Sequence, residues 1–143
     1  MLMGRAMFLA LLSGLLVAAQ PPASAASIEV AVSNIKSARG VVHVDICTEQ
    51  TFLHDCPWSG EAPAQVGTTI VTVRGVPPGR YAAQGFHDKN ANGKVDRMFL
   101  GIPTEGVGFS NDAPIHMAPP KFAHAAFDHG EGAQRITFKL RYF

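Results

Sequence analysis

The chain has 143 residues, of which 47% are hydrophobic and 16% charged, and its formal net charge at pH 7 is +1. A chain of this length forms one domain that is large enough to bury its own core. A near-neutral charge without a run of basic residues lacks the phosphate-neutralising contacts that dominate nucleic-acid binding, so we expect no nucleic-acid partner.

The first 25 residues have the features of a secretory signal peptide. Arg5 is the only charged residue before Glu29, an apolar run extends from Phe8 to Ala19, and Ala23-Ser24-Ala25 matches the small-residue cleavage pattern. The apolar run is shorter than the roughly 20 residues that span a bilayer. We therefore expect cleavage after Ala25, a single mature domain over residues 26–143 without a membrane span, and a periplasmic or secreted location.

In the mature chain, alternating apolar residues predict short strands over residues 28–35, 42–46, 68–73, 80–86 and 135–142. Residues 37–40 are typical of a hairpin connection, and residues 61–67 are a linker that contains proline and glycine. Residues 119–127 favour either a helical turn or an edge strand. Because no segment has a sustained helical period, the sequence predicts an all-β fold, an antiparallel β-sandwich of about seven strands.

Cys47 and Cys56 are the only two cysteines of the chain. In an exported protein such a pair is expected to be oxidised, and a loop this short stabilises by about 2.5 to 3 kcal/mol in the chain-entropy model. The alternative is a redox or metal-binding pair, for which neither a C-x-x-C spacing nor a second cysteine pair is present.

The stretch H-D-K-N-A-N-G-K-V-D, from His87 to Asp96, has the spacing of a calcium-binding loop. Calcium takes six to eight oxygen ligands, which helix-flanked loops supply from alternate positions around a glycine. The ligands that match this spacing are Asp88, Asn90, Asn92, the carbonyl of Lys94, and Asp96, with Gly93 at the turn. Phe99 replaces the usual final glutamate, and Glu105 would complete the shell if the loop folds back. We expect a weak site suited to extracellular calcium.

The alternative is that this stretch is only a turn. Asn92-Gly93 is a strong hairpin signal because both residues tolerate positive φ, and Asp and Asn side chains stabilise turns. A tight turn needs only part of the pattern, however, so we retain calcium as the expected cofactor.

Three blocks of the sequence together resemble a known family: H-D-K-N-A-N-G-K-V-D, G-I-P-T-E-G-V-G-F-S-N-D-A and P-P-K-F-A-H-A-A-F. With the final I-T-F-K-L-R-Y they are similar to the uncharacterised bacterial family called domain of unknown function 2141, over residues 28–142. The resemblance implies an exported single-domain protein with a transthyretin-like or immunoglobulin-like sandwich. It implies no established activity.

The sequence leaves three functions open. The first is a non-catalytic binding module with an unknown ligand or envelope partner, whose loop at residues 101–120 displays Phe109 and Met117. The second is a metal-dependent or transthyretin-like hydrolase, but the terminal Y-R-G-S sequence of the latter is absent and no Ser-His-acid motif is recognisable. His87, His116, His124 and His129 are the candidate transition-metal ligands. The third is a purely structural envelope protein.

Overall fold

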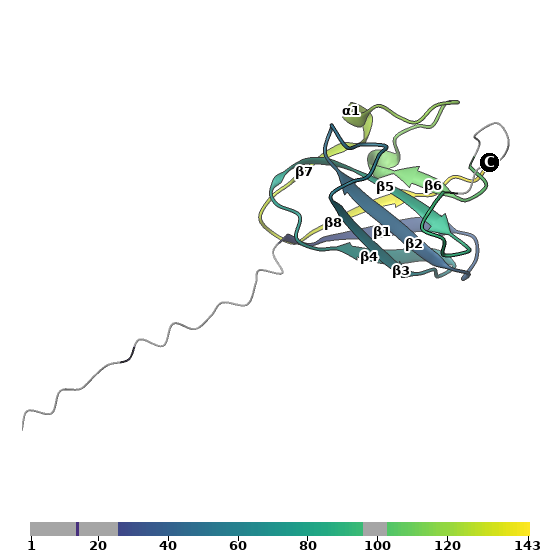
Figure 1. The fold of residues 1–143 in the computed structure, drawn as a ribbon, viewed down its shortest axis with the longest axis horizontal. Coiled ribbons are helices and arrows are strands. Elements are labelled where there is room, and N and C mark those ends of the chain that lie inside the picture. Colours follow the sequence, from purple (N-terminus) through teal and green to yellow (C-terminus); the bar gives the residue numbers. More distant parts are fainter. Residues whose placement is uncertain (1–13, 15–25, 96–102) are drawn as a thin grey trace, which may run out of the picture.

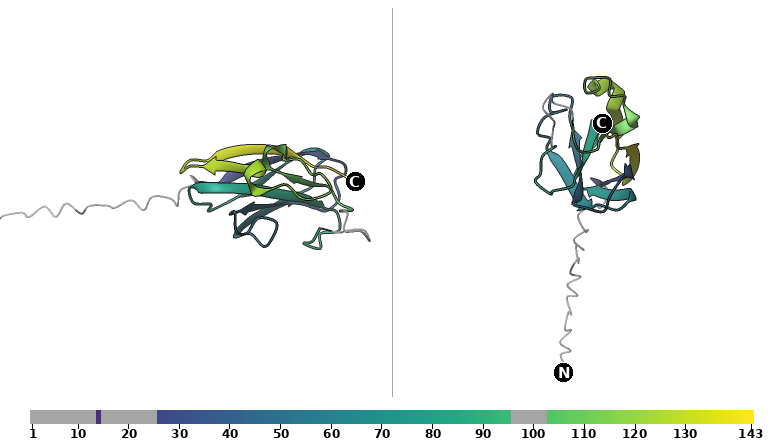
Figure 2. Two further views of the ribbon diagram at one scale, coloured as in Figure 1. Left: turned by 90° about the horizontal axis from the view of Figure 1, so that it is seen from above. Right: turned by 90° about the vertical axis from the view of Figure 1, so that its right-hand side faces the viewer.

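The computed structural model describes Gly14, residues 26–95 and residues 103–143. These residues form eight strands in two sheets that pack face to face (Figures 1 and 2). The predicted all-β sandwich is therefore confirmed, with one strand more than estimated. Within the described residues, no helix is both long and apolar enough to cross a bilayer.

The smaller sheet has the strand order β4-β1-β8, with β1 (Ile28–Ile35) in the centre. Its neighbour β4 (Gly67–Val73) runs antiparallel to it. The other neighbour, β8 (Gln134–Lys139), runs parallel, with Ile28 opposite Gln134 and Ser33 opposite Lys139. This parallel pair is an exception within the predicted antiparallel sandwich.

The larger sheet has the order β3-β2-β5-β6, in which β2 (Val41–Cys47) and β5 (Gly79–Asp88) are central. Strand β6 (Val107–Phe109) pairs with the second half of β5, and β7 (Ala126–His129) with its beginning. The edge strand β3 (Trp58–Pro63) was not predicted. Residues 61–63, which were interpreted as part of a linker, form its last half.

The main core lies between the two sheets and follows the period-2 pattern of the sequence. On β1 and β2 every second residue is buried, and the same alternation brings β4 and β8 side chains into the core. The largest fully buried side chains include Phe138, Ile28, Ile35, Ile46 and Leu140. Burial of these side chains between the two sheets stabilises the domain.

A backbone bridge joins the two sheets along one side. The N–H of Val107 donates to the carbonyl of Arg141 at 2.9 Å, and the N–H of Arg141 donates to the carbonyl of Val107 at 2.8 Å. The sandwich is therefore partly closed between β6 and the residues after β8, which protects that edge from pairing with other chains.

A second, smaller apolar cluster lies at one end of the molecule. It contains Cys47, Phe52 and Phe109 and packs under the short helix α1 (Phe122–Ala125), so residues 119–127 form a helical turn followed by a strand. The hydroxyl of Ser110, in the 3₁₀ turn η2 (Ser110–Asp112), accepts the N–H of Ala83 at 2.9 Å and donates to the carbonyl of Ala125.

The connections are divided between the two ends of the sandwich. Figure 1 shows the β1–β2 turn, the β3–β4 turn, the loop after β5 and the C-terminal residues together at the right-hand end. The disulfide loop after β2 and helix α1 lie toward the opposite end. The predicted calcium loop thus belongs to the first end.

Candidate functional site

The loop that follows β5 begins at a buried carboxylate. Asp88 is the last residue of β5 and is 1% exposed. Its Oδ1 accepts the backbone N–H of Asn92 at 3.1 Å, and its Oδ2 accepts that of Gly93 at 2.7 Å. A carboxylate has about four lone-pair sites, so both oxygens retain capacity for a further partner.

Asn90 and Asn92 repeat this arrangement along the loop. Asn90 Oδ1 accepts the N–H of Asn92 at 3.3 Å, and Asn92 Oδ1 accepts the N–H of Lys94 at 2.9 Å. These are the local side-chain bonds with which Asp and Asn shape turns. Positive φ occurs at Ala91 (53°) and Gly93 (77°), so the loop is not the two-residue hairpin at Asn92-Gly93 that the alternative interpretation expected.

Glu105 reaches the loop from 16 residues away. Its Oε1 accepts the backbone N–H of Lys89 at 3.3 Å, and the residue is only 4% exposed. The chain does fold back here, as the sequence analysis required for Glu105 to take part. Asp96, the remaining predicted ligand, lies outside the described residues, as does the rest of residues 96–102.

The end of β5, the β1–β2 turn and the residues after β8 support the base of the loop. The side chain of His87 is fully buried, and its Nε2 lies 2.7 Å from the carbonyl oxygen of Arg39, so Nε2 carries a proton and donates. Its Nδ1 lies 3.4 Å from the hydroxyl of Tyr142, whose pKa is raised by burial. At Gly40 an added Cβ would overlap the carbonyl oxygen of Asp88.

The four histidines proposed as metal ligands do not converge. His87 lies at the loop end of β5, whereas His129 pairs with Gly79 at the other end of that strand. His129 is satisfied by the carbonyl of Val76 at 3.1 Å and by Gln134 Oε1 at 2.7 Å. Among the described residues, no group of three or more His, Cys, Asp or Glu side chains is arranged to hold a metal ion. The histidine-site interpretation was therefore wrong.

A separate cluster of charges lies on the outer face of the larger sheet. His43 Nε2 is 2.7 Å from Asp45 Oδ1, and Nδ1 is 3.0 Å from Glu61 Oε1. The hydrogen bond to Asp45 raises the pKa of His43 to about 9, aided by Glu61 and opposed by partial burial. His43 is therefore a cation at neutral pH, and sequence reasoning missed it because its partners come from two strands.

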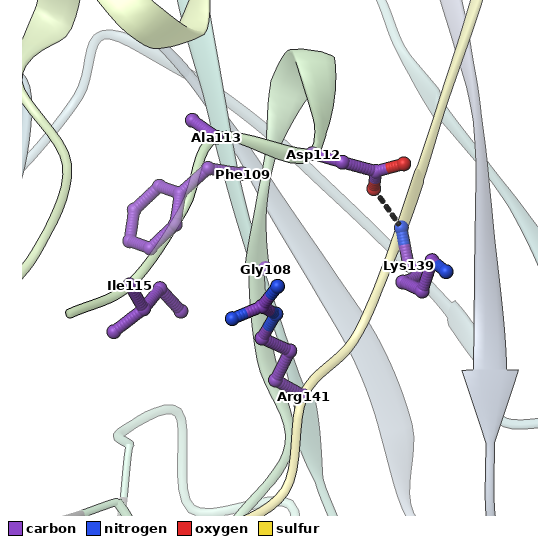
Figure 3. Close-up of a pocket in the computed structure, with 7 residues that line it drawn as sticks. All are labelled: Gly108, Phe109, Asp112, Ala113, Ile115, Lys139 and Arg141. Carbon is purple, nitrogen blue, oxygen red and sulfur yellow. Dashed lines mark hydrogen bonds between the residues drawn. The ribbon is translucent and has the colours of Figure 1, made fainter.

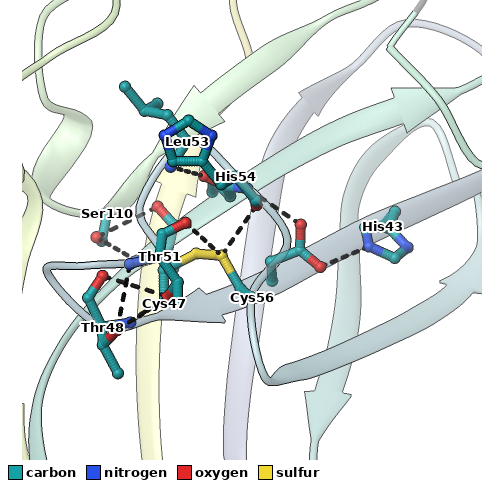
Figure 4. The surroundings of a disulfide bond; sticks show 11 residues. His43, Cys47, Thr48, Thr51, Leu53, His54, Cys56 and Ser110 are labelled. Carbon is teal, nitrogen blue, oxygen red and sulfur yellow. Dashed lines mark hydrogen bonds and ion pairs between the residues drawn. A yellow bond between two sulfur atoms is a disulfide. The ribbon is translucent and has the colours of Figure 1, made fainter.

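Cys47 and Cys56 form a disulfide, as predicted, with a Cα–Cα distance of 4.9 Å (Figure 4). The loop between them is ordered by Thr48 and Thr51, whose hydroxyl oxygens are 3.0 Å apart. Phe52 anchors the loop by packing edge to face on Phe109, with ring centroids 5.7 Å apart. The disulfide thus fixes the link between β2 and β3.

A small pocket lies beside β6 and the chain after β8 (Figure 3). Phe109 and Ile115 line one side, and Lys139, whose N–H donates to Asp112 Oδ1 at 2.8 Å, lines the other. Phe109 is only 9% exposed, so the expectation that it is displayed for a ligand was wrong, whereas Met117 is fully exposed. The pocket has no convergent set of catalytic groups, and the loop after β5 remains the better candidate site.

A family model described as "Uncharacterized protein conserved in bacteria (DUF2141)" matches residues 30–137. The chain belongs to this family. The DUF2141 region covers all of the candidate loop and the disulfide, and of the strand residues it omits only the first two of β1 and the last two of β8. No curated protein and no solved structure matches the chain significantly.

Proposed function

We propose that this DUF2141 protein is an exported, non-catalytic β-sandwich module whose loop after β5 binds one calcium ion. The observation that supports this most is the meeting of two buried carboxylates, Asp88 and Glu105, on the backbone of the same loop. The Cys47–Cys56 disulfide supports the proposed export, because disulfides are typical of proteins outside the cytoplasm.

Burial makes two neighbouring carboxylates costly unless a cation compensates them. Charged groups lose their hydration in the interior, and buried charges are usually paired or coordinate metals. Within the described residues, Asp88 forms no ion pair with a lysine or arginine. A calcium ion at the loop would compensate its charge.

The donor set is suited to calcium rather than to a transition metal. Asp88, Asn90, Asn92, the Lys94 carbonyl and Glu105 offer oxygen only, which is the preference of a hard cation. Water molecules commonly complete such shells. Because three of these five donors are neutral, the expected affinity is that of extracellular calcium modules, with a dissociation constant on the order of 10⁻⁴ to 10⁻³ M.

The experiment must separate calcium binding from a turn that needs no metal. Substitution of Asp88 is unsuitable, because both of its oxygens accept loop N–H groups and asparagine would lose one of these bonds even in a plain turn. Asn92→Asp is better. It retains the oxygen that accepts the N–H of Lys94 and adds one negative charge at a proposed ligand.

We expect calcium to raise the melting temperature of the wild-type protein, because the ion binds only the folded form. Asn92→Asp should increase this shift, since calcium affinity rises with the charge of the ligands. The measurement is a thermal melt in chelator and in millimolar calcium.

Gln65→Glu is the matched control, because Gln65 is exposed in the β3–β4 turn at the same end of the sandwich. It adds the same charge without adding a loop oxygen, so calcium should raise its melting temperature by the same amount as that of the wild type. If the melting temperatures of both wild type and Asn92→Asp are the same in chelator and in calcium, the loop is a turn that binds no calcium.

A further inference from the structure

Basic side chains gather at the end of the sandwich that carries the candidate loop. They come from the β1–β2 turn, the loop after β5 and the residues after β8, and four of them are exposed: Lys36, Arg39, Lys94 and Arg141, with Lys89 partly exposed beside them. We call these five residues the basic end. They are distant in sequence, so no basic run is visible in the chain.

The acidic residues nearest the candidate loop, Asp88 and Glu105, are both buried. Asp112 is exposed and lines the same pocket as Arg141, and its Oδ1 accepts the backbone N–H of Lys139. Lys36, Arg39 and Arg141 form no ion pair within the described part of the chain. The basic end therefore presents a net positive potential to solvent.

The opposite end has a mixed charge. Its exposed charged residues in loops are Glu49, Asp55, Arg74, Lys121 and Glu131. The whole chain has a formal net charge of only +1, so the positive potential is a property of one end and not of the molecule. Such a distribution orients the protein toward an anionic surface.

Exposed apolar side chains accompany the bases. Val66, in the β3–β4 turn, is 68% exposed, and Phe143, beyond β8, is 57% exposed. Apolar groups gain free energy when they enter the interfacial layer of a bilayer, while neighbouring lysines and arginines contact anionic headgroups. A dissolved polyanion would use the charges but would offer no apolar layer to these two residues.

We propose that the basic end docks the protein peripherally on an anionic lipid surface. The docking goes beyond the proposed calcium site and does not require it, because the bases and the apolar residues act without the ion. Each basic side chain near an anionic membrane strengthens binding roughly fivefold, so several of them give measurable attachment. Attraction of this kind weakens as salt screens it.

The test is co-sedimentation of the full protein with vesicles in the presence of a chelator. We expect binding to vesicles of phosphatidylcholine with phosphatidylglycerol, no binding to phosphatidylcholine alone, and loss of binding at high salt. The variant Lys36→Glu/Arg39→Glu/Arg141→Glu should bind at least about a hundredfold more weakly, since three fivefold contributions are removed.

The variant Arg74→Glu/Arg80→Glu/Lys121→Glu makes the same change in charge with exposed residues elsewhere on the molecule and should keep most of the binding. Melting curves check that both variants fold. Equal loss in the two variants, or no vesicle binding by the wild type, would overturn the proposal. So would retention on heparin without vesicle binding, which would indicate a soluble polyanion. Because the chelator removes calcium, none of these results depends on the proposed calcium site.

Discussion

His43 shows how single residues on the outer face of the sheet acquire properties that the sequence does not reveal. Both ring nitrogens lie within 3.0 Å of a carboxylate oxygen, one on Asp45 and one on Glu61. Each contact requires a donor, so the doubly protonated ring is the form that satisfies both carboxylates. This is why the pKa of His43 rises to about 9.

The raised pKa of His43 predicts a pH-dependent stability. Below pH 6.5 the ring is protonated in both the folded and the unfolded chain, and its stabilising effect is fully present. As the pH rises from 6.5 through about 9, the unfolded chain loses the proton first and the stabilisation declines. We expect a loss of about 1 kcal/mol, because the pair is partly solvated and screened.

Chemical unfolding at a series of pH values measures this decline, and His43→Gln should flatten it. His54→Gln is the matched control, because His54 is exposed in the disulfide loop, and it should keep the wild-type slope. An NMR titration midpoint of His43 near 6.5 instead of 9 would contradict the assignment.

At the residue scale, the site residues that are close together in the sequence could be predicted, whereas the one that is distant in sequence could not. Alternate spacing of Asp88, Asn90 and Asn92 is visible in the sequence, and the structure ties each of them to loop backbone. Glu105 comes from 16 residues away, and only the fold brings it to Lys89. Phe109 was misplaced for the same reason, because its partner Phe52 lies in the disulfide loop.

At the scale of elements, the β1–β2 turn and the candidate loop support one another. Gly40 has φ +71° and lies against the backbone of Asp88 and Lys89, so the turn packs on the start of the loop. In the same region, the carbonyl oxygen of Arg39 accepts a hydrogen bond from Nε2 of buried His87. The conformation of the loop therefore depends on an element that precedes it by about fifty residues.

Gly40→Ala should lower the free energy of unfolding by about 3 kcal/mol. A left-handed conformation costs a non-glycine residue about 1 to 2 kcal/mol, and overlap with backbone adds about 1 to 3 kcal/mol. Gly67→Ala is the matched control: it has φ +92° but no heavy atom within 4 Å of an added Cβ, so about 1 kcal/mol is expected. Urea unfolding measures the free energy of unfolding of both variants. Equal losses would contradict the close packing of Gly40 on the backbone of Asp88 and Lys89.

Strand prediction succeeded where one face of a strand is buried and failed at an edge. Period-2 burial made β1, β2 and β4 recognisable from the sequence. Strand β3 has the sequence WSGEAP without a fully buried residue, so its hydrogen bonds to β2, and not an apolar pattern, define it. The parallel pairing of β8 with β1 joins the last strand of the chain to the first. No local sequence pattern predicts such a pairing.

At the scale of the whole molecule, the fold gathers the special residues at one end. The candidate loop, the contact between buried His87 and partly buried Tyr142, and the basic end all lie where β1 meets β2 and β5 ends. The positive potential of the basic end opposes the approach of a cation, which is a second reason to expect weak calcium binding. The same arrangement would place a calcium-loaded loop next to the proposed lipid surface.

The central claim is that the loop after β5 binds calcium, and equilibrium dialysis of the purified protein with radioactive calcium tests it most directly. The account predicts one calcium ion per chain, with a dissociation constant on the order of 10⁻⁴ to 10⁻³ M, and little competition from magnesium, which requires a tighter octahedral shell. No bound calcium above background at about 10 mM, ten times the upper end of that range, would contradict it.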